Sequence, residues 1–181
     1  IDEQHKFGVN QRKKLSDKGG NNCDVLLMTA TPIPRTLTMT VYGDMDLSII
    51  REKPKIRKDI QTYSKLNSKI DDVIKFIKNE IKLKNQIFWV CPLIEESKKI
   101  DHESAIDKFN YLKKIFPNRV SLLHGKTDID NKEKILDNFL KKKFDILVST
   151  TIIEVGIDFP NANVIIIENA NKFGLSQLHQ L

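Results

Sequence analysis

The 181-residue sequence predicts an α/β fold in which helices flank a parallel sheet. Short continuous apolar runs, which are typical of strands buried on both faces, alternate along the chain with amphipathic helical segments. Hydrophobic residues make up 40% of the chain and charged residues 30%, a balance that argues against a disordered polymer. This length allows one domain or two small ones, and no apolar run is long enough to span a bilayer.

The expected strands are short apolar runs. The run over residues 60–66 alternates only weakly, and the run that follows it stops at Pro92. In chain order, the runs are Val25–Met28, Ile60–Leu66, Ile87–Val90, Val120–Leu123, Phe144–Val148 and Val164–Ile167.

Between these runs, apolar residues recur at helical spacing, with charged residues on the opposite face. Ser68 is the expected N-cap of the first helix, and Pro117 closes the second. Asp128 or Asp130 lies near the start of the third. The apolar residues that mark these three helices lie within residues 70–81, 105–116 and 135–140.

A charged segment that contains a proline, Arg51–Asp59, has the composition of a linker. We assign residues 1–52 to the C-terminal part of a first domain, 53–59 to the linker and 60–181 to a second domain. The first part is too short for a complete α/β domain. Because the chain begins without Met and ends inside an expected helix at Gln177–Leu181, we expect it to be a piece of a longer protein.

The charge balance allows a polyanionic partner without requiring one. Lys and Arg number 30 against 24 Asp and Glu, which gives a net charge of +6, and a biased codon supply would produce the same surplus. The two cysteines, Cys23 and Cys91, form no C-x-x-C pair, which argues against a disulfide framework and against a structural zinc site. His5, His124 and His179 do not have metal-ligand spacing.

The first segment that could carry chemistry is Asp2-Glu3-Gln4-His5, which follows an expected strand end. Ligands of open α/β sheets bind at the carboxyl ends of the strands. Adjacent acids there suit phosphate chemistry, in which one carboxylate holds Mg²⁺ through water and the other polarises an attacking water. A solvated surface pair is the alternative interpretation of the same acids.

A second candidate, Thr29–Thr36, follows the apolar run that ends at Met28. Two prolines stiffen this turn, and the hydroxyls of Thr29 and Thr31 could link groups on neighbouring strand ends. A capping turn without further function would have the same composition.

Two further strand ends carry features of phosphate binding. Leu123–Lys126 is a Gly-containing turn whose backbone N–H groups could hold a phosphate, with Lys126 adding charge, although a plain strand-to-helix turn would look similar. Ser149–Pro160 begins with three hydroxyl residues. Gly156 and Asp158 follow, which fits a loop that contacts phosphates and leaves an acid for a ribose hydroxyl.

In this order, the segments resemble the superfamily 2 helicases, which are built from two RecA-like motor domains. The resemblance covers nearly the whole chain and implies the end of motor domain 1 and most of motor domain 2. Asp2–His5 resembles motif II, Thr29–Thr31 motif III, Phe88–Ser97 the motif IV position, Ser149–Asp158 motif V and Gln177–Leu181 the opening of motif VI.

The resemblance implies a role for each matching residue. Asp2 would hold Mg²⁺ through water, Glu3 would activate the attacking water, and Gln4 and His5 would sense the γ-phosphate of ATP. Coupling between hydrolysis and domain closure would fall to Thr29, Ala30 and Thr31. The nucleotide would also be bound by Gly156, Asp158 and Gln180. The implied DNA-binding residues are Arg35, His124, Gly125, Thr150 and Thr151.

Within the superfamily, the Gln4-His5 pair and the Thr31–Thr36 segment resemble bacterial helicases that remodel branched DNA, such as stalled forks and Holliday junctions, in recombination and repair. This implies ATP and Mg²⁺ as cofactors, branched or forked DNA as the partner, a monomeric motor, a cytoplasmic location and no membrane contact. One alternative is the motor of a transcription-repair coupling translocase, which shares the Thr31–Thr36 segment. Another is a non-catalytic nucleic-acid-binding α/β module.

The chain also departs from the family pattern. It contains no Gly-rich phosphate loop ending in Gly-Lys-Ser or Gly-Lys-Thr, and the arginine fingers of motif VI would follow Leu181. We therefore expect the 181 residues alone neither to hydrolyse ATP nor to unwind DNA.

Overall fold

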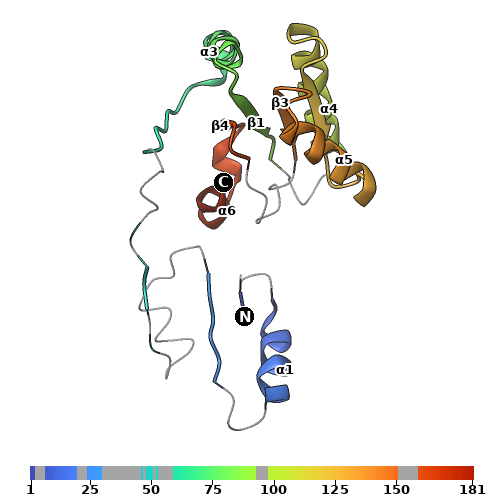
Figure 1. The fold of residues 1–181 in the computed structure, drawn as a ribbon. Coiled ribbons are helices and arrows are strands. Elements are labelled where there is room, and N and C mark those ends of the chain that lie inside the picture. Colours follow the sequence, from blue (N-terminus) through green and yellow to red (C-terminus); the bar gives the residue numbers. More distant parts are fainter. Residues whose placement is uncertain are drawn as a thin grey trace. The chain divides into compact units, whose positions relative to one another are not determined.

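The chain divides into two compact units, residues 1–61 together with Gln180 and residues 62–179 together with Leu181. Each unit is described by itself. Within them, the computed structural model (Figure 1) describes residues 1–2, 7–19, 24–29, 46, 48–50, 52, 59–92, 98–150 and 159–181.

The first unit contains helix α1 (Val9–Gly19), which the sequence analysis did not predict. The Gly8 N–H donates to Oε1 of Gln11 (3.0 Å) and the Gln11 N–H donates to the Gly8 carbonyl (3.1 Å), so the first turn is closed from both sides. The residues of α1 are mostly polar and form no apolar stripe, which is why periodicity did not reveal the helix.

Residues 24–29 of the first unit run beside the start of the chain. The Ile1 nitrogen donates to the Leu26 carbonyl (2.6 Å), and the Met28 N–H donates to the Ile1 carbonyl (2.9 Å). One residue bonded to two positions that lie two residues apart is the pattern of neighbouring parallel strands. The expected strand Val25–Met28 therefore has a parallel neighbour, although it is not assigned to a sheet.

The second unit is built on a four-stranded sheet of order β2-β3-β1-β4 in which every neighbouring pair is parallel (Figure 1). The four strands match the last four expected runs to within two residues at each end. Their bounds are β1 (Gln86–Val90), β2 (Val120–Leu123), β3 (Ile146–Ser149) and β4 (Ala162–Ile167).

The prediction of a strand at Ile60–Leu66 is wrong. These residues form no strand, and Ile60, Tyr63 and Leu66 are all strongly exposed. A weak alternation of apolar residues makes a strand only where a sheet edge accepts it, and no strand of the described residues pairs with this segment.

The helices of the second unit confirm the predicted amphipathic segments. Helix α4 is longer at its start than its apolar pattern indicated, and it ends two residues before Pro117, as proline requires. The elements are η2 (Asn67–Lys69), α3 (Ile70–Lys82), α4 (Lys98–Ile115), α5 (Ile129–Leu140), η4 (Ala170–Lys172) and α6 (Leu175–Gln180).

The expected N-cap Ser68 is wrong, whereas an acid does lie at the start of the third helix, as expected. Ser68 lies inside η2 and does not cap α3, whose N-cap is Lys69 without a side-chain hydrogen bond. Asp71 and Asp72 in the first turn of α3 instead complement the positive end of the helix dipole. Asp128 is the N-cap of α5, also without a side-chain bond.

The core has two layers, one on each face of the sheet. Helices α3 and α4 cover one face, where Trp89 of β1 and Val148 of β3 are buried, and α5 covers the other, where Leu147 and Phe139 are buried. Adjacent residues of β3 thus enter opposite layers. Burial on both faces is the physical reason that its sequence is continuously apolar.

Candidate functional site

The carboxyl ends of the four strands lie along one edge of the sheet because all strands are parallel. Backbone bonds continue past the strands there. The Cys91 N–H donates to the Ser149 carbonyl (2.8 Å), and the Thr150 N–H donates to the Leu123 carbonyl (3.3 Å). The residues that follow the strands are therefore held side by side, at the edge where open α/β sheets bind ligands.

The turn after β2 is held together by its own polar groups. The His124 N–H donates to the Thr127 hydroxyl (3.2 Å), and the Lys126 N–H donates to Nδ1 of His124 (3.2 Å). A neutral imidazole with Nδ1 as acceptor carries its proton on Nε2. Gly125 and Lys126 are exposed, as a turn that contacts a phosphate backbone requires.

Thr150 follows β3, next to this turn. Its side chain is 95% buried, since the residue is 5% exposed, and its hydroxyl has no hydrogen-bond partner in the described part of the chain. A buried hydroxyl without a partner is uncommon in native proteins, because burial removes its bonds to water. The structure therefore brings three predicted DNA-binding residues, His124, Gly125 and Thr150, to neighbouring strand ends.

In the first unit, two predicted residues follow paired segments. Asp2 comes directly after Ile1, and Thr29 directly after Met28, whose N–H donates to Ile1. Asp2 is exposed and Thr29 half-buried. The expected motif II acid and motif III hydroxyl thus continue from two neighbouring chain segments.

The remaining predicted site residues cannot be placed. Gln180 lies in α6, and its side chain is not described. The others fall outside the described residues: Glu3, Gln4, His5, Ala30, Thr31, Arg35, Thr151, Gly156 and Asp158.

Sequence reasoning missed a polar cluster around Glu168, the residue after β4. Its carboxylate accepts hydrogen bonds from Nε1 of Trp89 (3.1 Å) and Sγ of Cys91 (3.7 Å) and forms an ion pair with Nζ of Lys108 (2.9 Å). We call these four residues the Glu168 cluster. The available signal was an acid placed directly after a strand-like run, but its partners lie far away in the sequence.

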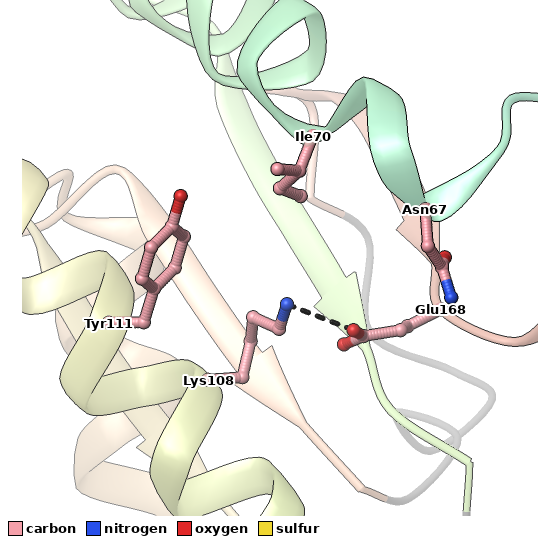
Figure 2. Close-up of a pocket in the computed structure, with 5 residues that line it drawn as sticks. All are labelled: Asn67, Ile70, Lys108, Tyr111 and Glu168. Atoms are coloured by element: carbon pink, nitrogen blue, oxygen red, sulfur yellow. Dashed lines mark ion pairs between the residues drawn. The ribbon is translucent and has the colours of Figure 1, made fainter.

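The Glu168 cluster borders an open pocket of about 320 Å³. Figure 2 shows Lys108 reaching from α4 toward the Glu168 carboxylate, with Tyr111 on the same helix. The Lys108 ammonium also lies 5.1 Å from the Trp89 ring centroid and 5.5 Å from that of Tyr111, within cation–π range. The lining residues are Asn67, Ile70, Lys108, Tyr111 and Glu168.

The cluster changes the chemistry of Cys91. Burial, together with the nearby Glu168 carboxylate, raises the pKa of the Cys91 thiol from 9.0 to about 12, and the Lys108 charge opposes this only in part. The thiol is therefore neutral at physiological pH and acts as a hydrogen-bond donor rather than a nucleophile.

In the described ranges, no group of three or more His, Cys, Asp or Glu side chains is arranged to hold a metal ion. Mg²⁺ is commonly bound by one or two carboxylates, with water and substrate phosphates completing its shell, so a site at Asp2 needs no such group. None of the helices in the described part of the chain has both the length and the apolar character needed to cross a bilayer.

The chain is similar to known helicases in sequence and in structure. Residues 68–181 match the model of the helicase conserved C-terminal domain. The chain is 51% identical over 182 residues to the ATP-dependent DNA helicase RecG of Bacillus subtilis, and 47% identical over 183 residues to that of Thermotoga maritima. It covers 99% and 100% of its own length in these matches, but only 26% and 23% of the two relatives.

A solved structure of RecG bound to a three-way DNA junction is similar over the whole chain, with a TM-score of 0.73 and 42% sequence identity; the match covers 23% of that chain. The predicted fold class is confirmed, because the parallel sheet with helices on both faces is the RecA-like fold of the helicase C-terminal domain. The predicted resemblance to superfamily 2 helicases that act on branched DNA is confirmed as well.

Proposed function

This chain belongs to the family of the helicase conserved C-terminal domain, and we propose that it is part of an ATP-dependent DNA helicase that remodels branched DNA. The substrates would be stalled forks and Holliday junctions in recombination and repair. The observation that carries this proposal is the match to RecG along the whole chain, which includes the structure of RecG on a three-way DNA junction. The chain spans about a quarter of the length of the relatives it matches, and the proposed activity is that of the whole protein.

We assign the DNA contacts to the edge of the sheet that carries His124, Gly125 and Thr150. The exposed turn supports this assignment, and so does the buried Thr150 hydroxyl, which has no partner among the residues that the structure describes. A motor that moves along DNA must not depend on base sequence, so amides, hydroxyls and an imidazole directed at phosphates suit it better than base-reading side chains. Thr151 and Arg35 are the further DNA-binding residues of this proposal.

The nucleotide would be ATP with Mg²⁺. The metal ion would neutralise phosphate charge and help to polarise the phosphoryl group that is transferred. We assign Asp2 to hold the ion through water and Glu3 to orient the attacking water, with Gln4 and His5 next to the γ-phosphate. The exposed Asp2 carboxylate suits an ion that keeps most of its waters.

Two further groups complete the proposed motor. Thr29, Ala30 and Thr31 would couple hydrolysis to movement, and the parallel pairing of the segments before Asp2 and Thr29 supports this role. The second domain would contribute Gly156, Asp158 and Gln180 to the nucleotide. Segment 53–59 would act as the hinge between a domain ending at residue 52 and another starting at residue 60.

The test is the ATPase rate of the full-length protein with forked, three-way, linear duplex and single-stranded DNA. Strongest stimulation by branched DNA, together with unwinding of a labelled fork, is the expected result. Equal stimulation by linear duplex, combined with release of a stalled RNA polymerase, would favour the transcription-repair coupling translocase instead. DNA binding without turnover would identify a non-catalytic module.

A further inference from the structure

The Glu168 cluster joins three elements at the carboxyl edge of the sheet. Glu168 follows β4, Trp89 and Cys91 belong to the end of β1, and Lys108 lies in α4. One carboxylate therefore accepts an indole N–H and a thiol, and it also pairs with the Lys108 ammonium, which Figure 2 marks with a dashed line. Because its donors belong to separate parts of the chain, such a carboxylate fixes their positions relative to one another.

The pair is partly shielded from water. The side chains of Lys108 and Glu168 are 19% and 21% exposed. A partly buried ion pair adds little net stability over well-packed apolar residues, because both charges lose water. Geometric control is a better explanation of this cluster than stability, and it can be tested separately from stability.

A chain of neighbouring backbone bonds runs from Glu168 to the proposed DNA contacts. The Glu168 N–H donates to the Val90 carbonyl (2.9 Å), and the Cys91 N–H donates to the Ser149 carbonyl (2.8 Å). Thr150 follows Ser149, the last residue of β3. A shift of the β4 end against α4 would therefore be transmitted through β1 to the strand end that carries Thr150.

Glu168 also precedes the turn toward α6. Asn169 has a left-handed backbone with φ of 50°, and the Lys172 N–H donates to its carbonyl (2.9 Å), so the extended backbone of β4 is followed by a turn at Glu168 and Asn169. The position of the Glu168 side chain thus affects both the DNA-facing edge and the path toward the expected start of motif VI.

We propose that Glu168, held by Lys108, is a positioning residue that determines how strongly DNA accelerates ATP hydrolysis. The inference rests on the proposed function and deepens it. Neither residue needs to touch DNA or nucleotide. Their role is to hold the ends of β1 and β4 against α4 in the arrangement in which a DNA contact at the sheet edge is transmitted.

The experiment compares ATPase rates of the full-length protein with and without three-way junction DNA. For Glu168→Gln and for Lys108→Met, the stimulation ratio should fall about fivefold, the size typical of mutations along a coupled network. The double variant should lose no more than the worse single variant, because both remove one interaction. Lys108→Arg keeps the charge and should restore most of the stimulation.

The matched control is the ion pair between Arg119 and Asp145 at the opposite edge of the same sheet. Its atoms are 3.1 Å apart, and the Asp145 side chain is 21% exposed, as is that of Glu168. Asp145→Asn should leave the stimulation ratio unchanged. Thermal unfolding of each full-length variant, followed by circular dichroism, reports whether the packed core is retained.

The outcomes separate the two proposals. Normal stimulation in both Glu168→Gln and Lys108→Met would overturn the positioning role, and so would an equal loss in Asp145→Asn, since that would be a general effect on stability. Absence of DNA-stimulated turnover in the unmodified protein would overturn the proposed function itself.

Discussion

Thr150 and Glu168 each follow a strand of one sheet, yet their polar atoms have opposite surroundings. The buried Thr150 hydroxyl has no partner within the described residues, whereas the Glu168 carboxylate has three. An unpaired buried hydroxyl is a cost to folding, and a saturated carboxylate is a fixed point. Thr150 is therefore suited to contact a ligand and Glu168 to hold the structure around it.

Thr150→Val tests the first of these roles. Valine has the shape of threonine without the hydroxyl, so we expect unchanged or slightly raised stability, because the Thr150 hydroxyl makes no bond to the described residues that could be lost. Affinity of the full-length protein for fork DNA should fall about tenfold, the usual loss for a hydrogen bond to a charged group. Fluorescence anisotropy with a labelled fork measures the affinity.

Thr127→Val is the contrasting variant, since the Thr127 hydroxyl does accept a bond, from the His124 N–H. It should lower the free energy of unfolding by about 1 kcal/mol. An unchanged affinity for DNA in Thr150→Val would remove that hydroxyl from the proposed contact.

Cys91 provides a prediction about pH. Its folded pKa is raised to about 12 by burial and by Glu168, while the thiol of the unfolded chain ionises near 9.0. The neutral Cys91 thiol therefore makes its full contribution to the free energy of unfolding below pH 9. This contribution is lost as the pH rises toward 12, by at most about 1.4 kcal/mol per pH unit. Between pH 8 and pH 10, the free energy of unfolding measured with urea should fall less for Cys91→Ala than for the unmodified chain.

The raised pKa of the Cys91 thiol also protects it from alkylation. Iodoacetamide at pH 8 should leave Cys91 unmodified in the folded protein and modify it in urea, as followed by mass mapping of its peptide. Rapid modification under native conditions would show that Cys91 is not buried as described.

At the scale of elements, the sequence predicted every strand of the sheet in the second unit but failed where local pattern and tertiary contacts disagree. Runs such as 146–149 are apolar because both faces are covered, which is a property visible in sequence. Segment 60–66 shows a similar but weaker pattern and stays exposed. The polar helix α1 is the opposite case, since it forms without an apolar stripe.

Helix α5 depends on Phe139, which is fully buried and has ring centroids 4.9 Å from Phe88 and 5.3 Å from Phe144. Phe139→Ala should lower the free energy of unfolding by about 3–5 kcal/mol, because it removes buried surface and leaves a cavity. Leu140→Ala is the control at the next position. Leu140 is 40% exposed, so its loss should cost about 1 kcal/mol or less.

Urea denaturation followed by Trp89 emission measures both variants. Equal losses in Phe139→Ala and Leu140→Ala would mean that α5 does not cover the sheet through the face described above.

At the scale of the molecule, all the buried hydrophobic residues of the described chain belong to the second unit, from Ile74 to Val148. We therefore expect residues 62–181 to fold when expressed alone. Circular dichroism should show a cooperative thermal transition, and Trp89 should emit as a buried indole. Exposed-indole emission without a transition would show that the second unit needs the first.

A separate prediction concerns activity. The 181 residues contain no phosphate loop of the form Gly-x-x-x-x-Gly-Lys-Ser/Thr, because Gly125-Lys126-Thr127 has Val120 where the first glycine would stand. The chain by itself should therefore show no DNA-stimulated ATP hydrolysis. A coupled ATPase assay of the purified chain with fork DNA checks this, and measurable stimulated turnover would contradict it.

The sequence by itself determined the class of fold, the strands of the parallel sheet and which strand ends carry hydroxyl, imidazole and glycine residues. Those properties follow from local composition, because a strand covered on both faces must be apolar throughout. Tertiary structure alone decided that Glu168 meets Trp89, 79 residues away, and that buried Gln86 donates to the Phe139 carbonyl, 53 residues away. Such pairings depend on which strands become neighbours, and strand order leaves no local trace in sequence.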